Sequence, residues 1–396
     1  MPSALSDYVR APDEAFSWQK VSTEGRVQRF RMTSQVWHGG PWTHDIVVVS
    51  PSRAVAKNAA ILYITGADPN PLDLDEAHRL ADLSGLAVAH LFQIPNQPLL
   101  DELYEDDLIA ETLVRCLDSG DMTWPLLLPM TKSAIRAMDV LDANGFARYV
   151  VTGSSKRGWT SWLTAATGDK RVIGIAPMVF DNLNFFAQLQ HQVKDWSEPS
   201  EMISPYTSRN LGERIQTPEG QQLAAIIDPY TYRELITIPK MIINGSNDRY
   251  WSVDSLSLYW DGLKEPKYAS IVPNAGHGLG DMSQALHAVS ALARSCVEKL
   301  ALPNLSWVYD KSSLEIRCEG GFPNVKFWLA ESETLDFRNS EWWVRGECGV
   351  GRMEGATARF EVASSKRNQA VMAEMIFEAK GFGYSLSAPV RVFRSA

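Results

Sequence analysis

The sequence predicts an α/β fold: a doubly wound, mostly parallel sheet with a helical cap insertion, followed by a small antiparallel β-sandwich. Three observations predict it. Apolar runs alternate with amphipathic stretches through most of the chain, as they do in repeated strand–helix–strand units. This alternation is interrupted at about residues 180–235, and after Pro303 only short alternating runs remain. We therefore expect a first domain over residues 1–302 and a second over residues 303–396.

The first domain is expected to begin with an antiparallel hairpin over residues 26–50, because a Gly-Gly-Pro turn divides two strand-like runs there. Apolar runs typical of strands buried on both faces of a parallel sheet follow. They lie at residues 58–64, 86–92, 149–152, 172–176, 240–245 and 269–273. Helices are expected at residues 72–84, 105–117, 130–144, 156–167 and about 280–300.

The two remaining regions differ from this pattern. Residues 180–235 are rich in Asn, Gln, Pro and aromatic residues, and we expect them to form a cap that shapes a substrate site above the edge of the sheet. Alternating short runs after Pro303 predict an antiparallel sandwich. These runs lie at residues 305–309, 313–317, 325–329, 358–362 and 371–378.

Composition limits the classes of partner. The formal net charge is −9 and no run of Lys and Arg occurs, which argues against nucleic acid and anionic membranes. We expect a soluble protein, because no apolar stretch approaches the roughly 18 residues of a membrane helix. The first residues lack the basic start and apolar core of a secretory signal. The compartment stays open, so Cys318 and Cys348 are expected either to pair or to remain free thiols. The cysteine spacing matches no metal site, and no cofactor is expected.

A strand-to-helix turn carries the main chemical motif. Residues 153–158 read Gly-Ser-Ser-Lys-Arg-Gly between a buried strand and a helix. A sharp turn of this kind lifts a serine out of the sheet, and the helix N-terminus favours a developing oxyanion. Arg157 stands where the G-x-S-x-G pattern has its second glycine, with Gly158 one place later. Spacing favours Ser155 over Ser154 as the nucleophile. The alternative interpretation is a serine that only caps the helix.

Two later strand ends supply partners for this serine. Asp248 follows the strand at 240–245, and His277 follows the strand at 269–273. The chain order Ser, Asp, His is that of the α/β-hydrolase fold, and sites of doubly wound sheets form at the carboxyl ends of strands. A histidine takes and returns the serine proton, and a carboxylate orients the imidazole. We therefore predict a catalytic triad of Ser155, Asp248 and His277.

Alternatives exist for the acid and the base. Asp254 is a second candidate acid, although its position is more typical of a helix cap. The other histidine near the end of the domain, His287, is expected on the face of the last helix.

The oxyanion is expected to be held by the backbone N–H of Lys156 and by that of Gly66 or Ala67, in the loop after the strand at 58–64. The side chains of Lys156 and Arg157 are expected to reach the oxyanion or a substrate carboxylate, or else to pair with Glu105 and Asp106. Further candidate substrate contacts are Trp159, Arg157, His191 and Trp251.

Several stretches resemble the PhoPQ-activated pathogenicity-related protein family, which also includes autocrine proliferation repressor proteins. They are residues 93–98, 105–110, 124–132, 153–159 and 244–248. The resemblance covers about residues 15–390, and it implies an α/β-hydrolase domain, a C-terminal β-domain, and export in many members. The turn is also similar to that of glucuronoyl esterases, which have a basic residue after the nucleophile, where Lys156 stands here.

These observations favour a cofactor-independent serine hydrolase acting on a small ester or peptide. A carboxylesterase is favoured, because no clear clamp for a peptide amino terminus is found. Glu198 and Glu201 are the acidic candidates for such a clamp, and a dipeptidyl-peptidase-like enzyme is the alternative. The alternative from another class is a binding or signalling protein on a hydrolase scaffold, against which the complete Ser, Asp, His order argues.

Overall fold

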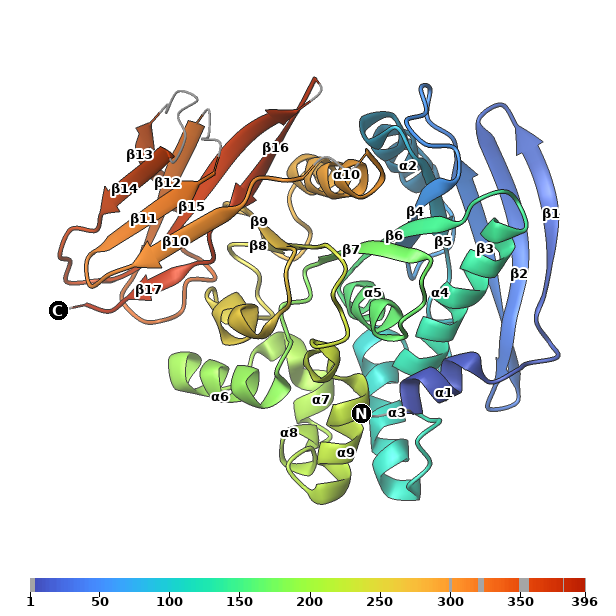
Figure 1. The fold of residues 1–396 in the computed structure, drawn as a ribbon. Helices are drawn as coiled ribbons and strands as arrows, with labels where there is room; N and C mark the ends of the chain where they lie inside the picture. The colour runs from blue at the N-terminus through green and yellow to red at the C-terminus, as the bar shows by residue number, and fades with distance from the viewer. Residues whose placement is uncertain (1–3, 299–300, 320–323, 349–355, 380, 396) are drawn as a thin grey trace.

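A computed structural model of the protein describes residues 4–298, 301–319, 324–348, 356–379 and 381–395 (Figure 1). Its centre is a nine-stranded sheet of order β1-β2-β3-β5-β4-β6-β7-β8-β9. The strands are β1 (Ser17–Glu24), β2 (Val27–Trp37), β3 (Gly40–Val49), β4 (Ala59–Ile64), β5 (Ala87–Leu91), β6 (Arg148–Ser154), β7 (Val172–Met178), β8 (Lys240–Gly245) and β9 (Lys267–Val272). The first three are antiparallel, and the sheet is parallel from β5 to β9. The predicted α/β fold class is confirmed.

Helices cover both faces of this sheet (Figure 1). One face carries α2 (Pro71–Ser84) and α10 (Ser283–Glu298), which contact each other. The other carries α1 (Ala4–Arg10), α3 (Glu105–Ser119), α4 (Leu127–Asp142) and α5 (Lys156–Ala166). All six residues of β4 are buried, and they alternate between two apolar clusters, one on each side of the sheet. Because side chains alternate across a strand, a strand covered on both faces must be apolar throughout, as the sequence indicated.

The insertion between β7 and β8 is helical, as expected. It contains α6 (Phe185–Trp196), η1 (Glu201–Ile203), α7 (Ser204–Thr207), α8 (Leu211–Arg214), α9 (Pro218–Ile227) and η2 (Pro229–Tyr232). Two further turns, η3 (Ser255–Leu258) and η4 (Trp260–Gly262), follow β8. The cap packs against α3 through α7 and α9, and it gathers on the α5 side of the sheet (Figure 1).

The C-terminal part of the chain forms a small β-domain of antiparallel sheets. One sheet contains β10 (Leu305–Tyr309), β11 (Ser313–Cys318) and β14 (Ala356–Glu361). The other contains β13 (Trp342–Cys348), β12 (Asn324–Ser332), β15 (Asn368–Ala379), β16 (Phe382–Ser387) and β17 (Arg391–Phe393). Strand β16 packs against β9 and α10, and inward side chains such as Ile316 and Phe327 share one apolar cluster with α10. The β-domain is thus joined to the sheet by a continuous core.

The structure differs from the expected elements in a few places. Strand β1 was not expected, because it is exposed along almost its whole length and lacks an apolar pattern. Helix α4 begins three residues before the expected start, with Pro129 in its first turn, where proline is tolerated. The two alternatives for Cys318 and Cys348, a disulfide or free thiols, both stay predictions, since the Cys348 side chain lies outside the described residues. In the described ranges no helix is long and apolar enough to cross a membrane.

Candidate active site

Ser155 occupies a strained turn between β6 and α5. Its backbone has φ 58° and ψ −122°, a combination that costs a non-glycine residue about 1–3 kcal/mol and is concentrated at functional sites. The Ser155 N–H donates to the carbonyl of Met178 at 2.9 Å, which helps to hold the turn. The Ser155 side chain makes no capping bond to α5, so the helix-cap interpretation is wrong. Ser154 ends β6.

Close packing explains the glycines of the motif. A Cβ added to Gly153 would lie 2.7 Å from the Cβ of Arg157 and 2.8 Å from the carbonyl oxygen of Ile64. One added to Gly158 would lie 2.8 Å from the carbonyl oxygen of Met178. The glycine that lets α5 approach β7 is therefore one residue later than in G-x-S-x-G.

Asp248 and His277 meet at the carboxyl ends of β8 and β9. His277 Nδ1 lies 2.7 Å from Asp248 Oδ2, and Asp248 Oδ1 accepts the backbone N–H of Tyr250 at 2.9 Å. The other imidazole nitrogen, His277 Nε2, is buried and bonds to none of the described residues. The imidazole packs on the Tyr250 ring with centroids 4.3 Å apart. The geometry leaves Nε2 available to exchange a proton.

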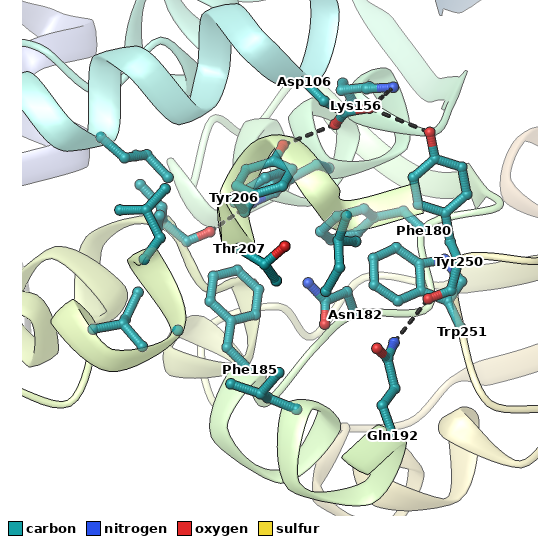
Figure 2. Close-up of a pocket in the computed structure, with 18 of the residues that line it drawn as sticks. Asp106, Lys156, Phe180, Asn182, Phe185, Gln192, Tyr206, Thr207, Tyr250 and Trp251 are labelled. Carbon is teal, nitrogen blue, oxygen red and sulfur yellow. Dashed lines mark hydrogen bonds and ion pairs between the residues drawn. The ribbon is translucent and has the colours of Figure 1, made fainter. Parts of the chain in front are cut away.

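Ser155 borders a cavity of about 140 Å³ between the sheet and the cap. Figure 2 shows side chains that line this cavity. The predicted contacts Trp159 and Trp251 line it, whereas Arg157 and His191 are absent from the part of its lining that the structure describes. Residues from α6, α7 and α8 close the opposite side. They include Phe185, Leu189, Gln192, Tyr206, Thr207, Leu211 and Gly212.

A polar junction stands at one side of this cavity (Figure 2). Lys156 Nζ lies 2.6 Å from Asp106 Oδ2, and Asp106 also accepts hydroxyl bonds from Tyr206 at 2.8 Å and Tyr250 at 3.2 Å. Burial, and next the Asp106 charge, raise the pKa of both tyrosines. The Lys156 side chain is thus paired with an acid, one of the two expectations for it. Tyr206 and Tyr250 had no motif that marked them as site residues, whereas Asp106 lies in the motif at residues 105–110 and was an expected partner of Lys156.

Arg157 is held beneath the loop that follows β4. It donates to both Glu105 carboxylate oxygens and to the carbonyl oxygen of Ile94, each at 2.6 Å. Burial alone would raise the pKa of Glu105, but the bonds and charge of Arg157 lower it to about 2. A Cβ on Gly66 would lie 1.5 Å from Arg157 Nη2, so the Gly66 backbone rests on the guanidinium. Neither Gly66 nor Ala67 donates a backbone bond to another described residue.

The remaining candidates lie elsewhere. His191 Nε2 is 2.6 Å from Asp254 and 3.1 Å from Asp195. Burial works to lower the pKa of His191, but these two acids raise it. Asp254 makes no side-chain cap, so the expected capping role is wrong. His287 lies on α10 beside Phe382, as expected.

The acidic candidates for an amino-terminus clamp have other surroundings. Glu201 pairs with Arg249 and Arg338, and Glu198 is exposed. Neither carboxylate belongs to the described lining of the Ser155 cavity.

The sheet order, the strained serine turn and the Asp and His loops at the strand ends define an α/β-hydrolase fold. Two solved structures support this fold. Acetyl xylan esterase 1 from Thermoanaerobacterium sp. JW/SL YS485 has a TM-score of 0.52 and 17% identity, covering 73% of this chain and 91% of that one. Acetyl xylan esterase from Paenibacillus sp. R4 has a TM-score of 0.50 and 15% identity, covering 69% and 86%.

The chain belongs to the PhoPQ-activated pathogenicity-related protein family, which it matches over residues 5–338. It is 30% identical over 377 residues to autocrine proliferation repressor protein A of Dictyostelium discoideum, covering 84% of this chain and 76% of that protein. The resemblance stated from the sequence motifs is confirmed.

Proposed function

We propose that the protein is a serine hydrolase of the carboxylesterase class, with Ser155 as nucleophile, His277 as base and Asp248 as orienting acid. The bond of 2.7 Å between His277 Nδ1 and Asp248 carries this proposal. It fixes the proton on Nδ1 and leaves the buried Nε2 as the acceptor. Tyr250 connects the two halves of the site, because it contacts the His277 imidazole and lines the same cavity as Ser155.

In the proposed reaction, Ser155 Oγ forms a bond to the ester carbonyl carbon while its proton passes to His277 Nε2. The tetrahedral intermediate expels the alcohol, which takes that proton from His277. A water molecule then gives a proton to His277 and attacks the acyl-enzyme to form a second tetrahedral intermediate. Collapse of this intermediate releases the acid and returns the proton from His277 to Ser155. Asp248 orients the imidazole and stabilises the imidazolium in both steps of the reaction.

Backbone donors would stabilise the oxyanion. Lys156 is the first residue of α5, where an N–H has no partner within its helix and the helix dipole is positive. The loop at Gly66 and Ala67, held on Arg157, supplies the second candidate donor. Donors of this kind typically contribute a factor of about 10²–10³ in kcat.

Fluorophosphonate labelling tests the proposal. Wild type and Ser154→Ala should be labelled and Ser155→Ala should not, because Ser154 is the adjacent hydroxyl without the strained turn. A panel of p-nitrophenyl esters and dipeptide anilides then compares esterase with dipeptidyl-peptidase activity. Well-folded wild type that resists labelling and hydrolyses neither substrate would contradict the proposal and favour a binding protein on this scaffold.

A further inference from the structure

The walls of the cavity beside Ser155 are mainly aromatic and aliphatic. Trp159 stacks on Phe180 with centroids 5.0 Å apart and meets Phe185 edge-on at 5.5 Å. The Trp159 indole N–H donates to the carbonyl of Ile227 at 2.6 Å. Its polar atom is therefore satisfied by the protein, and its ring forms part of a rigid apolar wall.

Several polar groups at the cavity are already paired within the protein. Asp106 accepts from Lys156, Tyr206 and Tyr250. Gln192 donates to the carbonyl of Tyr250 at 2.8 Å and accepts the N–H of Ser200. A ligand that bonded to Asp106 or Gln192 would have to displace these bonds, whereas an apolar ligand only replaces water against the apolar walls.

We propose, resting on the hydrolase function above, that this cavity holds an apolar group of the ester about the size of a benzene ring. Its volume is about 140 Å³, and an apolar cavity of about 150 Å³ in another protein binds benzene. A phenyl group or a chain of about four to six carbons fits this volume, whereas an acetyl group leaves most of it empty.

Substrate chain length tests this size. If the acyl group occupies the cavity, kcat/KM for p-nitrophenyl acyl esters should rise about fourfold for each methylene added to the acyl chain. If the alcohol group occupies it, kcat/KM for alkyl acetates should rise by the same factor for each methylene added to the alkyl chain. The rise should stop near six carbons. A flat profile in both series overturns the proposal.

Paired variants of α6 locate the effect. Leu189→Trp fills the cavity that Leu189 lines, and Val193→Trp on the same helix is the control, since Val193 is 43% exposed. Only Leu189→Trp should abolish the chain-length gain while fluorophosphonate labelling persists. Equal profiles for the two variants overturn the proposal.

A binding measurement separates this proposal from the hydrolase function. Toluene binding to Ser155→Ala, followed by calorimetry, requires no catalysis. We expect binding in Ser155→Ala and in the double variant with Val193→Trp, and its loss in the double variant with Leu189→Trp. Absence of toluene binding to Ser155→Ala refutes the cavity assignment even if wild type is an active hydrolase. Toluene binding to Ser155→Ala, together with a wild type that fluorophosphonate does not label, refutes only the hydrolase function.

A separate set of contacts joins the β-domain to the loops of Asp248 and His277. Asn247 Nδ2 donates to the carbonyl of Ser340 at 2.6 Å. Asn274 exchanges two bonds with the Trp342 backbone, donating at 3.0 Å and accepting at 2.8 Å. Asn247 adjoins the acid, and Asn274 precedes the base by three residues. The segment over residues 337–342 therefore touches both loops.

The two loops are also bonded to each other, and the segment is anchored. Ser246 Oγ donates to Asn247 Oδ1 at 2.7 Å and accepts the Asn274 N–H at 2.8 Å. Phe337 and Trp342 are 1% and 2% exposed in the β-domain core. The positions of Asp248 and His277 thus depend on a buried part of the β-domain.

We infer that the segment 337–342 positions the acid and base, with Asn247 and Asn274 as positioning residues; this too rests on the proposed hydrolase function. Asn274 has φ 57°, so Asn274→Gly keeps the backbone conformation and removes only the side-chain bonds. Asn368→Gly is the control, because Asn368 makes comparable bonds to backbone groups within the β-domain.

We expect Asn274→Gly to lower kcat by about 10- to 100-fold, with KM changed less than about twofold, because displacements near 1 Å have effects of that size. Asn368→Gly should retain the wild-type kcat. The low-field proton NMR signal of the His277 Nδ1–H should weaken only in Asn274→Gly, and this signal needs no turnover. A wild-type kcat and an unchanged proton signal in Asn274→Gly overturn the inference. If wild type shows no hydrolase activity but the proton signal still weakens in Asn274→Gly, only the hydrolase function is refuted.

Discussion

Replacing Arg157 by lysine tests the buried support of the loop at Gly66 and Ala67, which we propose as a donor to the oxyanion. Arginine makes three bonds of 2.6 Å here, two to Glu105 and one to the carbonyl oxygen of Ile94. Lysine has a single ammonium group in place of the planar fork, so we expect it to keep one of these bonds. Two bonds of a charged group are lost, each worth about 1.5–3 kcal/mol.

The lower end of this range applies, because the Glu105 side chain is 37% exposed and water screens its charge. We expect Arg157→Lys to lower the free energy of unfolding by about 3 kcal/mol. At about 1.2 °C per kcal/mol for a chain of 396 residues, the melting temperature falls by about 4 °C. Ester hydrolysis should also fall, since Gly66 rests on the guanidinium.

Calorimetry and p-nitrophenyl ester kinetics measure the two effects. Arg171→Lys is the matched control, because Arg171 bonds Asp139, Asp142 and Asp169 just before β7 begins. It thus lies at the amino end of a strand, whereas Ser155 follows the carboxyl end of the neighbouring β6. Both variants should melt earlier, and only Arg157→Lys should lose activity. A wild-type melting temperature for Arg157→Lys, or equal kinetics for the two variants, would refute the reasoning.

Three further variants probe other contacts. Gly158→Ala places a Cβ 2.8 Å from the Met178 carbonyl and should cost about 2 kcal/mol by chemical denaturation; an unchanged midpoint would contradict this. Asp228→Ala removes the acceptor of three backbone N–H groups at the starts of α6 and η2, so limited proteolysis should cut the cap sooner, and unchanged cutting would argue against it. Burial raises the pKa of Asp181 from 3.8 to about 7, so its stabilising contribution is complete below about pH 3.8 and lost as pH rises through 7. Asp181→Asn should therefore gain up to about 4 kcal/mol relative to wild type between about pH 4 and pH 8; a difference that does not vary with pH would exclude this.

Sequence periodicity determined most of the sheet. Strands such as β4 are buried on both faces, so each appears in the sequence as a continuous apolar run that predicts a strand without knowledge of its neighbours. The antiparallel β1 was not predicted, because its residues are exposed and its sequence has no apolar pattern. The positions of Ser155, Asp248 and His277 at strand ends were readable for the same reason, since the chain order of strands implies which loops share an edge.

Tertiary structure decided which side chains meet. Sequence proposed both a site role and acid pairing for Lys156, and only the fold brings its ammonium to Asp106 beside Tyr206 of the cap. His191 was a candidate substrate contact, but the cap helix turns it toward Asp254. Asn274 reaches Trp342 across 68 residues of sequence. Such contacts depend on loop conformation and on the docking of distant elements, and neither leaves a periodic signal in the chain.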